Sequence, residues 1–186
     1  MERFEDLTER TVSSQQVYEG CLLDVRRDEV QLPNGKTSVR EYIRKCGAVC
    51  IVPLFENGDV LLEKQYRYPM GEVYTEIPAG KMDPDETDPE AAARRELREE
   101  TGAEAGELIF LGRFCPCCAY SSEIIYMYLA RDLHFGEQKL DEDEFLNTFR
   151  LPMAELLQLI ADDRIPDGKT QAAVLRAVRY LNAENK

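Results

Sequence analysis

The chain is short of positive charge and has a single histidine, His134. Its 23 lysines and arginines stand against 36 aspartates and glutamates, which gives a net charge of −13 at pH 7. A nucleic-acid-binding surface needs clustered positive charge, so this balance argues against nucleic acid as a partner. A small anionic ligand stays compatible with it, because a bound cation and a few arginines can supply positive charge locally.

Long apolar runs are also absent. No stretch approaches the roughly 20 apolar residues that span a bilayer, so we expect no membrane partner. The charged N-terminus, Met1–Arg10, lacks the apolar centre of a signal peptide, and the chain has no internal repeat or low-complexity segment. Hydrophobic residues make up 44%, which is enough to bury a substantial core. These features lead us to expect a cytoplasmic enzyme-sized protein.

The cysteines lack the pairing of a typical zinc site. Only one Cys-x-x-Cys spacing occurs, within Cys115-Pro116-Cys117-Cys118, and no second pair answers it. A zinc site would need a further ligand, for which the candidates are Cys46, Cys50 and His134. In a reducing compartment disulfides are improbable, so free thiols, together with a packing or surface role for His134, are the favoured interpretation.

The most informative feature present is a glycine loop followed by a helix rich in carboxylates. After Gly80 the chain runs to Arg-Glu-Leu-Arg-Glu-Glu-Thr-Gly at residues 95–102. At about 100° per residue, Glu96, Glu99 and Glu100 fall within one sector of the helix surface. Such like charges destabilise a helix unless a cation lies between them, and Mg²⁺ takes carboxylate oxygens together with substrate phosphates. The pattern predicts metal-assisted chemistry on a phosphate ester or anhydride.

A solvated helix face is the alternative interpretation. Arg95 and Glu99 form an i, i+4 pair of the kind that stabilises exposed helices. The surroundings favour a site instead, because residues 76–80 look like a strand that ends in a sharp turn, and Gly102 lies where a helix stop is expected.

This segment resembles the Nudix box, G-x5-E-x7-R-E-U-x-E-E-x-G-U, in which U is a bulky aliphatic residue. The matching residues are Gly80, Glu86, Arg95, Glu96, Leu97, Glu99, Glu100 and Gly102. Eight residues rather than seven separate Glu86 from Arg95, and Ala103 is small for the last position. The additional residue falls in a turn-rich loop, where insertions are tolerated, so we expect the metal carboxylates to be unaffected. In the family, the glutamate at the position of Glu86 supports the loop and the helix. Because the spacing to Arg95 differs here, the resemblance alone does not assign this role to Glu86.

Further segments resemble the ADP-ribose pyrophosphatase branch of the Nudix hydrolases, over residues 15–183. They are residues 65–69, 76–80, 122–126, 140–144 and 167–170. The resemblance implies hydrolysis of the pyrophosphate bond of a nucleoside diphosphate sugar with Mg²⁺, or Mn²⁺ in its place. ADP-ribose, which gives AMP and ribose 5-phosphate, is the leading substrate. It also implies a homodimer whose subunits share the substrate pocket.

The same resemblance implies roles for individual residues. The metal ligands would be the Ala79 carbonyl, Glu96, Glu99 and Glu100, and Arg95 would hold a box glutamate by a salt bridge. Substrate contacts would come from Arg67 and Arg40 on the diphosphate, with Glu76 and Glu123 as further polar candidates.

The general base is expected within the acidic segment 140–144. Residue types alone indicate a surface loop there, but its resemblance to a catalytic loop points to Glu142. Glu144 is an alternative base or an additional metal ligand.

Strand and helix signals predict an α/β fold: a Nudix-type α/β/α sandwich with a mixed β-sheet, plus an N-terminal antiparallel β-hairpin region. Expected strands are 17–32 (interrupted near Arg26), 37–43, 48–55, 60–66, 73–77, 108–114, 124–130 and 145–151, and expected helices are 89–101, 153–161 and 170–183. Turn signals at 33–35 and 57–58 predict two hairpins. We expect residues 1–45 to form a dimerisation element and residues 46–186 the hydrolase domain.

One loop departs from the ADP-ribose branch. That branch usually has (Ser/Thr)-Pro-Gly-(Phe/Tyr) before the segment at Ser122, and here the sequence is Cys-Cys-Ala-Tyr at residues 117–120. Cysteine and alanine have neither the fixed φ of proline nor the freedom of glycine, so another nucleoside diphosphate sugar or a dinucleotide is an alternative substrate. A different class of function is a non-catalytic nucleotide-sensing Nudix domain, but such domains usually lose box glutamates, and all three are present.

Overall fold

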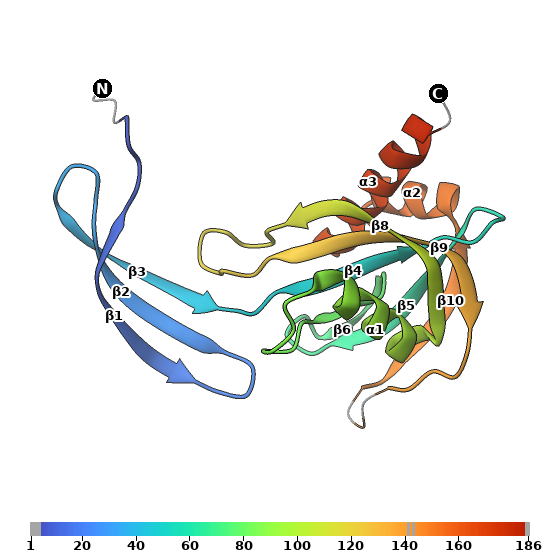
Figure 1. Ribbon diagram of the computed structural model, residues 1–186, viewed down its shortest axis with the longest axis horizontal. Coiled ribbons are helices and arrows are strands. Elements are labelled where there is room, and N and C mark those ends of the chain that lie inside the picture. Colours follow the sequence, from blue (N-terminus) through green and yellow to red (C-terminus); the bar gives the residue numbers. More distant parts are fainter. Residues whose placement is uncertain (1–4, 141, 143, 185–186) are drawn as a thin grey trace. The chain divides into compact units, whose positions relative to one another are not determined.

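The computed structural model describes residues 5–140, 142 and 144–184, which cluster into two compact units. The N-terminal unit comprises the chain up to Cys46 together with Cys117–Glu123, and the larger unit comprises the rest (Figure 1). Among the described residues, no helix is both long and apolar enough to cross a membrane.

The N-terminal unit contains a three-stranded antiparallel sheet of β1 (Arg10–Glu19), β2 (Asp24–Gln31) and β3 (Thr37–Arg44). The hairpin predicted at residues 33–35 is confirmed, and Gly35 adopts a φ of 80° there. The interruption predicted near Arg26 within residues 17–32 is wrong, because the chain turns earlier, at residues 20–23, where the Gly20 N–H donates to the Leu23 carbonyl at 2.9 Å, and β2 runs unbroken through Arg26. Strand β1 was missed over most of its length, since all its residues are exposed and leave no apolar alternation to detect.

The cysteine-containing loop belongs to the same unit. The Ile43 N–H donates to the Tyr120 carbonyl at 2.8 Å, and the Ser122 N–H donates to the Ile43 carbonyl at 3.0 Å. The Ser122 hydroxyl in turn accepts from the Lys45 N–H at 2.9 Å. These bonds attach residues 117–123 to the end of β3, so the loop that departs from the ADP-ribose branch is held by the N-terminal unit.

The larger unit has two sheets. The first is mixed, with the order β7 (Ala79–Lys81), β4 (Ala48–Pro53), β9 (Ile125–Phe135) and β8 (Ala103–Phe114), in which β4 and β9 run parallel. The second is antiparallel, with the order β10 (Leu146–Pro152), β5 (Asp59–Arg67) and β6 (Glu72–Glu76). The strand β7 was not predicted; it begins at Ala79, within the segment 76–80 that was expected to end in a turn.

The second predicted hairpin is wrong. The turn exists, with Gly58 at a φ of 87° and the Phe55 N–H donating to the Asp59 carbonyl at 2.9 Å, but the pairing ends at the isolated bridge between Leu54 and Val60, and β4 and β5 lie in different sheets. All six residues of β4 are buried, and its two edges are taken by β7 and β9. A local turn signal cannot reveal that a strand is central, because centrality depends on partners distant in the sequence.

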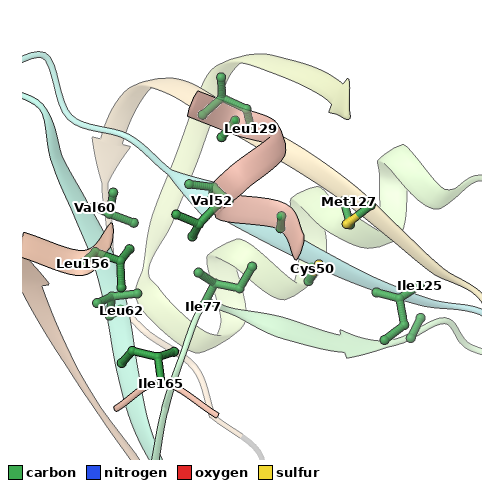
Figure 2. Packing of buried hydrophobic residues seen from close by; sticks show 14 residues of the cluster. Cys50, Val52, Val60, Leu62, Ile77, Ile125, Met127, Leu129, Leu156 and Ile165 are labelled. Carbon is green, nitrogen blue, oxygen red and sulfur yellow. The ribbon is translucent and has the colours of Figure 1, made fainter. Parts of the chain in front are cut away.

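Helices cover both faces of the mixed sheet. Helices α1 (Pro89–Thr101) and α2 (Met153–Ala161) have the predicted bounds, and α3 (Gly168–Glu184) begins two residues before the predicted start. Alternate residues of β4 point to opposite faces. Val49 and Ile51 pack in the cluster that contains α1, whereas Cys50 and Val52 pack in the cluster that contains α2 and α3 (Figure 2). The predicted α/β/α sandwich is confirmed.

All six cysteines are unpaired thiols. Cys50 is fully buried within the α2–α3 cluster, and burial raises the pKa of its thiol to about 12. Its role is therefore packing, and the thiol is poorly suited to metal binding, which requires the thiolate. His134 is exposed and lies 3.4 Å from a carboxylate oxygen of Asp132.

Candidate active site

Local signals fix the position of helix α1. The Asp88 side chain caps its start by accepting from the Glu90 N–H at 2.9 Å, and Pro89 occupies the first turn. The helix ends at Gly102, which adopts the left-handed conformation with a φ of 70°. Both ends are therefore held, and the helix presents its carboxylates in a defined register.

Two of those carboxylates are packed against strand β7. Glu100 is 2% exposed, and its Oε2 accepts from the Ala79 N–H at 2.9 Å. The Glu96 carboxylate lies against Gly80 so closely that a Cβ added there would be 1.9 Å from its Cδ. Gly80 is needed for this close approach, and Glu99 is the most exposed of the three box glutamates.

Arg95 lies between the box carboxylates. Its Nη1 donates to Glu96 at 2.9 Å and to Glu99 at 3.0 Å, while Nε and Nη2 donate to the two oxygens of Glu86 at 3.2 and 2.9 Å. Glu86 also accepts from the Asp83 N–H at 2.9 Å. In spite of the additional loop residue, Glu86 thus ties the loop to the helix through Arg95.

The electrostatics of the cluster favour a cation. Burial raises the pKa of Glu96 to about 7 and that of Glu100 to about 10. For Glu100 the neighbouring charges of Glu63, Glu96 and Glu144 add to this effect. Carboxylates crowded in this way resist ionisation until a positive charge joins them.

Glu63 on β5 belongs to this cluster, although sequence reasoning gave it no role. Its side chain is fully buried, and neither carboxylate oxygen has a hydrogen-bond partner among the described residues. Burial raises its pKa to about 8, and the charge of Glu76 contributes further. The signal available in the sequence was a glutamate directly after the apolar run Val60–Leu62, at a position that strand alternation turns inward.

A second charged group lies beside Glu63 in the sheet formed by β10, β5 and β6. Arg67 forms a bidentate pair with Glu76, with both bonds at 2.7 Å, and Glu76 is 1% exposed. The Lys169 ammonium, to which sequence reasoning gave no role of its own, also donates to Glu76 and lies 3.1 Å from Asp167. Strand pairing sets Glu76 opposite Glu63, so this group and the carboxylate cluster are neighbours.

Two predicted substrate residues lie in the N-terminal unit. Arg40 on β3 pairs with Glu9, with its Nε 2.8 Å from Oε2. Glu123 is half-buried, and its backbone N–H donates to the Ser121 hydroxyl at 3.2 Å. The structure brings together Arg67 and Glu76 but gives Arg40 and Glu123 partners within their own unit.

The two candidate bases differ in their surroundings. Glu142 is exposed in a turn, and its neighbours Asp141 and Asp143 lie outside the described residues. Glu144 is half-buried, and its charge contributes to the raised pKa values of Glu63, Glu96 and Glu100. Glu144 is therefore the candidate that interacts with the carboxylate cluster.

Comparison with known proteins shows the family of this chain. A family model for the NUDIX domain matches residues 44–174. The chain belongs to the Nudix family. A second family model, for the N-terminal domain of nucleoside diphosphate sugar hydrolases, matches residues 9–43.

Individual relatives cover nearly the whole chain. A methanol dehydrogenase activator of Bacillus methanolicus is 40% identical and aligns over 95% of this chain and 94% of its own length. An ADP-ribose pyrophosphatase of Bacillus subtilis (strain 168) is 36% identical over 90% of this chain and 91% of its own. The crystal structure of an ADP compounds hydrolase superposes with a TM-score of 0.85 at 27% identity, covering 97% of this chain and 98% of that one.

Nudix hydrolases generally use a divalent metal, and the donors here fit such an ion. The acidic side chains of the cluster offer carboxylate oxygens, which hard cations prefer, and both oxygens of Glu63 are unpartnered among the described residues. In the described part of the chain, no group of three or more acidic, histidine or cysteine side chains is arranged to hold a metal ion. The Arg95 guanidinium forms salt bridges with Glu96 and Glu99. These two side chains must therefore break those salt bridges before they can bind a metal ion.

Proposed function

We propose that this Nudix protein hydrolyses the pyrophosphate bond of a nucleoside diphosphate sugar in the presence of Mg²⁺, with Mn²⁺ as an alternative ion. ADP-ribose is the leading substrate, and water converts it to AMP and ribose 5-phosphate. The observation that carries the proposal is the cluster of buried carboxylates on α1 and β5 beside the Arg67–Glu76 pair. The ADP-ribose pyrophosphatase relative, which aligns over 90% of the chain, supports the choice of substrate.

The metal ligands in this proposal are Glu96, Glu99, Glu100 and the Ala79 carbonyl. A bound Mg²⁺ would neutralise phosphate charge and lower the pKa of the attacking water. Helix α1 and strand β7 hold these oxygens before substrate arrives, because Glu100 is bonded to the Ala79 backbone and Glu96 packs on Gly80. Arg95 would stay bound to Glu86 and keep the loop attached to the helix.

Arg67 is suited to bind the diphosphate. Its Nε and Nη2 are held by Glu76, while Nη1 makes no hydrogen bond to the described residues. The side chain is 38% exposed, so a fixed guanidinium faces solvent with donors available for phosphate oxygens. Lys169 fixes Glu76 from the other side.

Glu144 is the proposed general base. It lies close enough to the carboxylate cluster to raise the pKa values of its members, whereas Glu142 is exposed in a turn. A carboxylate there would accept the proton of the water that attacks the diphosphate. Glu142 stays the alternative indicated by the family resemblance.

The substrate is tested by chromatography of products from ADP-ribose, ADP-glucose, GDP-mannose, UDP-glucose, NADH and diadenosine polyphosphates, each with Mg²⁺ and with EDTA. We expect selective, EDTA-sensitive release of AMP from ADP-ribose. Faster hydrolysis of another compound of the panel would contradict the assignment of ADP-ribose as substrate but would still support pyrophosphate hydrolysis as the reaction. If the folded protein forms no product from any compound of the panel, hydrolysis is contradicted and the nucleotide-sensing function is favoured.

We further propose a homodimer formed through the N-terminal sheet. Every residue of β1 is exposed, including Val12 at 59%, Val17 at 48% and Tyr18 at 57%, and apolar side chains gathered on one strand are typical of an interface.

Sedimentation equilibrium should give twice the chain mass, and replacing both Val12 and Val17 with lysine should give monomers. The control is Leu175→Lys, which changes an exposed apolar residue of the larger unit and should leave the dimer intact. A wild-type monomer at micromolar concentration would contradict this proposal.

A cytoplasmic location also belongs to the proposal. It is supported by the six unpaired cysteines, which suit a reducing compartment.

A further inference from the structure

Glu63 is a buried acid without a structural partner. It follows Val60, Leu61 and Leu62 on β5, is 0% exposed, and has no hydrogen bond to either carboxylate oxygen among the described residues. Burying a carboxylate in this way is strongly unfavourable, so native proteins pair such groups or use them to coordinate metals. A glutamate with only a packing role would be replaced at no loss by an apolar residue such as its neighbours.

Glu63 is surrounded by acids with which it interacts electrostatically. Strand pairing sets it opposite Glu76, its charge acts on Glu100, and the charge of Glu144 acts on Glu63. Arg67 and Lys169, the cations whose charges act on Glu63, are both bonded to Glu76. The charges of acids from α1, β5 and the segment before β10 therefore act on one another, while no hydrogen bond or ion pair to a described cation reaches the oxygens of Glu63.

We propose that Glu63 supplies a further carboxylate to the divalent-cation site, so that the ion is shared between helix α1 and strand β5. This rests on the proposed function for the existence of the cation site, but it concerns a residue outside the Nudix box. Carboxylate oxygens from two elements suit Mg²⁺ or Mn²⁺, which take several oxygen ligands around one ion. The alternative is that Glu63 is a permanently protonated acid with no part in ion binding.

Mn²⁺ titrated into metal-free protein without substrate tests the proposal, with free Mn²⁺ followed by electron paramagnetic resonance. We expect Glu63→Gln to weaken Mn²⁺ binding by about ten-fold or more, the effect typical of groups that shape a metal site. In EDTA the variant should melt at the wild-type temperature or above it, because the substitution removes a buried ionisable group that has no hydrogen-bond partner among the described residues. The rise in melting temperature caused by Mn²⁺ should shrink.

Two further variants make the test decisive. Glu63→Leu has a similar volume and resembles the neighbouring residues of β5, so it replaces Glu63→Gln if the amide is poorly tolerated. Asp28→Asn is the matched control, because Asp28 is also buried with one unpartnered oxygen among the described residues but lies in the N-terminal unit. It should leave Mn²⁺ binding unchanged.

Wild-type Mn²⁺ affinity and an unchanged melting-temperature rise in both Glu63 variants would overturn the inference. A wild-type protein that binds no Mn²⁺ would overturn it together with the whole metal site. If the Glu63 variants lose Mn²⁺ affinity while the wild type hydrolyses none of the nucleotide substrates, the inference stands and the proposed function fails.

Discussion

Replacing Glu100 with glutamine should abolish turnover while the protein stays folded. Glu100 is 2% exposed, and its Oε2 accepts from the Ala79 N–H at 2.9 Å, a bond that the glutamine oxygen can also accept. The substitution keeps the shape and removes the charge that the cation needs. We expect kcat to fall by at least about 10²–10³-fold, the range for loss of one electrostatic contact to a transition state.

Initial rates of AMP release at saturating Mg²⁺ measure this effect, and a thermal melt in EDTA shows whether the fold is kept. The melting temperature should not fall, because Glu100 is crowded by the negative charges of Glu63, Glu96 and Glu144. Glu104→Gln is the matched control, since Glu104 is exposed on β8, and it should hydrolyse at the wild-type rate. A Glu100→Gln enzyme with near wild-type kcat would contradict the assignment of this carboxylate as a metal ligand.

Replacing Gly80 with alanine should damage activity far more than stability. A Cβ at this position would lie 1.9 Å from Cδ of Glu96 and 2.1 and 2.2 Å from its two oxygens. The clash is with the end of a flexible side chain, which can rotate away at a cost of about 0.5–1.5 kcal/mol. The displaced carboxylate then no longer faces the site, and we expect a loss of about 10–100-fold in metal affinity or activity.

The Mg²⁺ concentration for half-maximal rate, together with the melting temperature, separates these two effects for Gly80→Ala. Gly136→Ala is the control, because its added Cβ would meet only the Gly102 carbonyl oxygen, at an ordinary 3.8 Å. This control should retain both properties. An unchanged Mg²⁺ requirement in Gly80→Ala would show that the position of the Glu96 carboxylate is irrelevant to metal binding.

The helix that carries the site could be predicted to the residue, whereas strand pairing could not. Helix α1 begins after an aspartate cap and a proline and ends at a left-handed glycine, and these signals lie next to one another in the sequence. The β4–β5 hairpin was wrong because burial of β4 between β7 and β9 overrides the turn at Gly58. The fully exposed β1 gave no pattern at all over its first residues.

The residues of the site likewise divide into those that local sequence motifs reveal and those that only the folded structure reveals. The box glutamates and Arg67 were given roles through motif resemblance, whereas Glu63 and Lys169 were given none, although residues 167–170 were among the matching segments. Recognising Glu63 requires the β5–β6 register, which sets it opposite Glu76, and Lys169 reaches that same glutamate from 93 positions away along the chain. Such proximity comes from tertiary packing, which no local pattern encodes.

The most direct test of the central claim is a ³¹P NMR time course of ADP-ribose with wild-type protein and Mg²⁺, repeated with EDTA. Hydrolysis of the pyrophosphate bond predicts that the diphosphate signals disappear while two phosphomonoester signals, those of AMP and ribose 5-phosphate, grow in equal amounts. EDTA should stop the change. Diphosphate signals that persist with Mg²⁺ and folded protein would contradict the assignment of ADP-ribose as substrate.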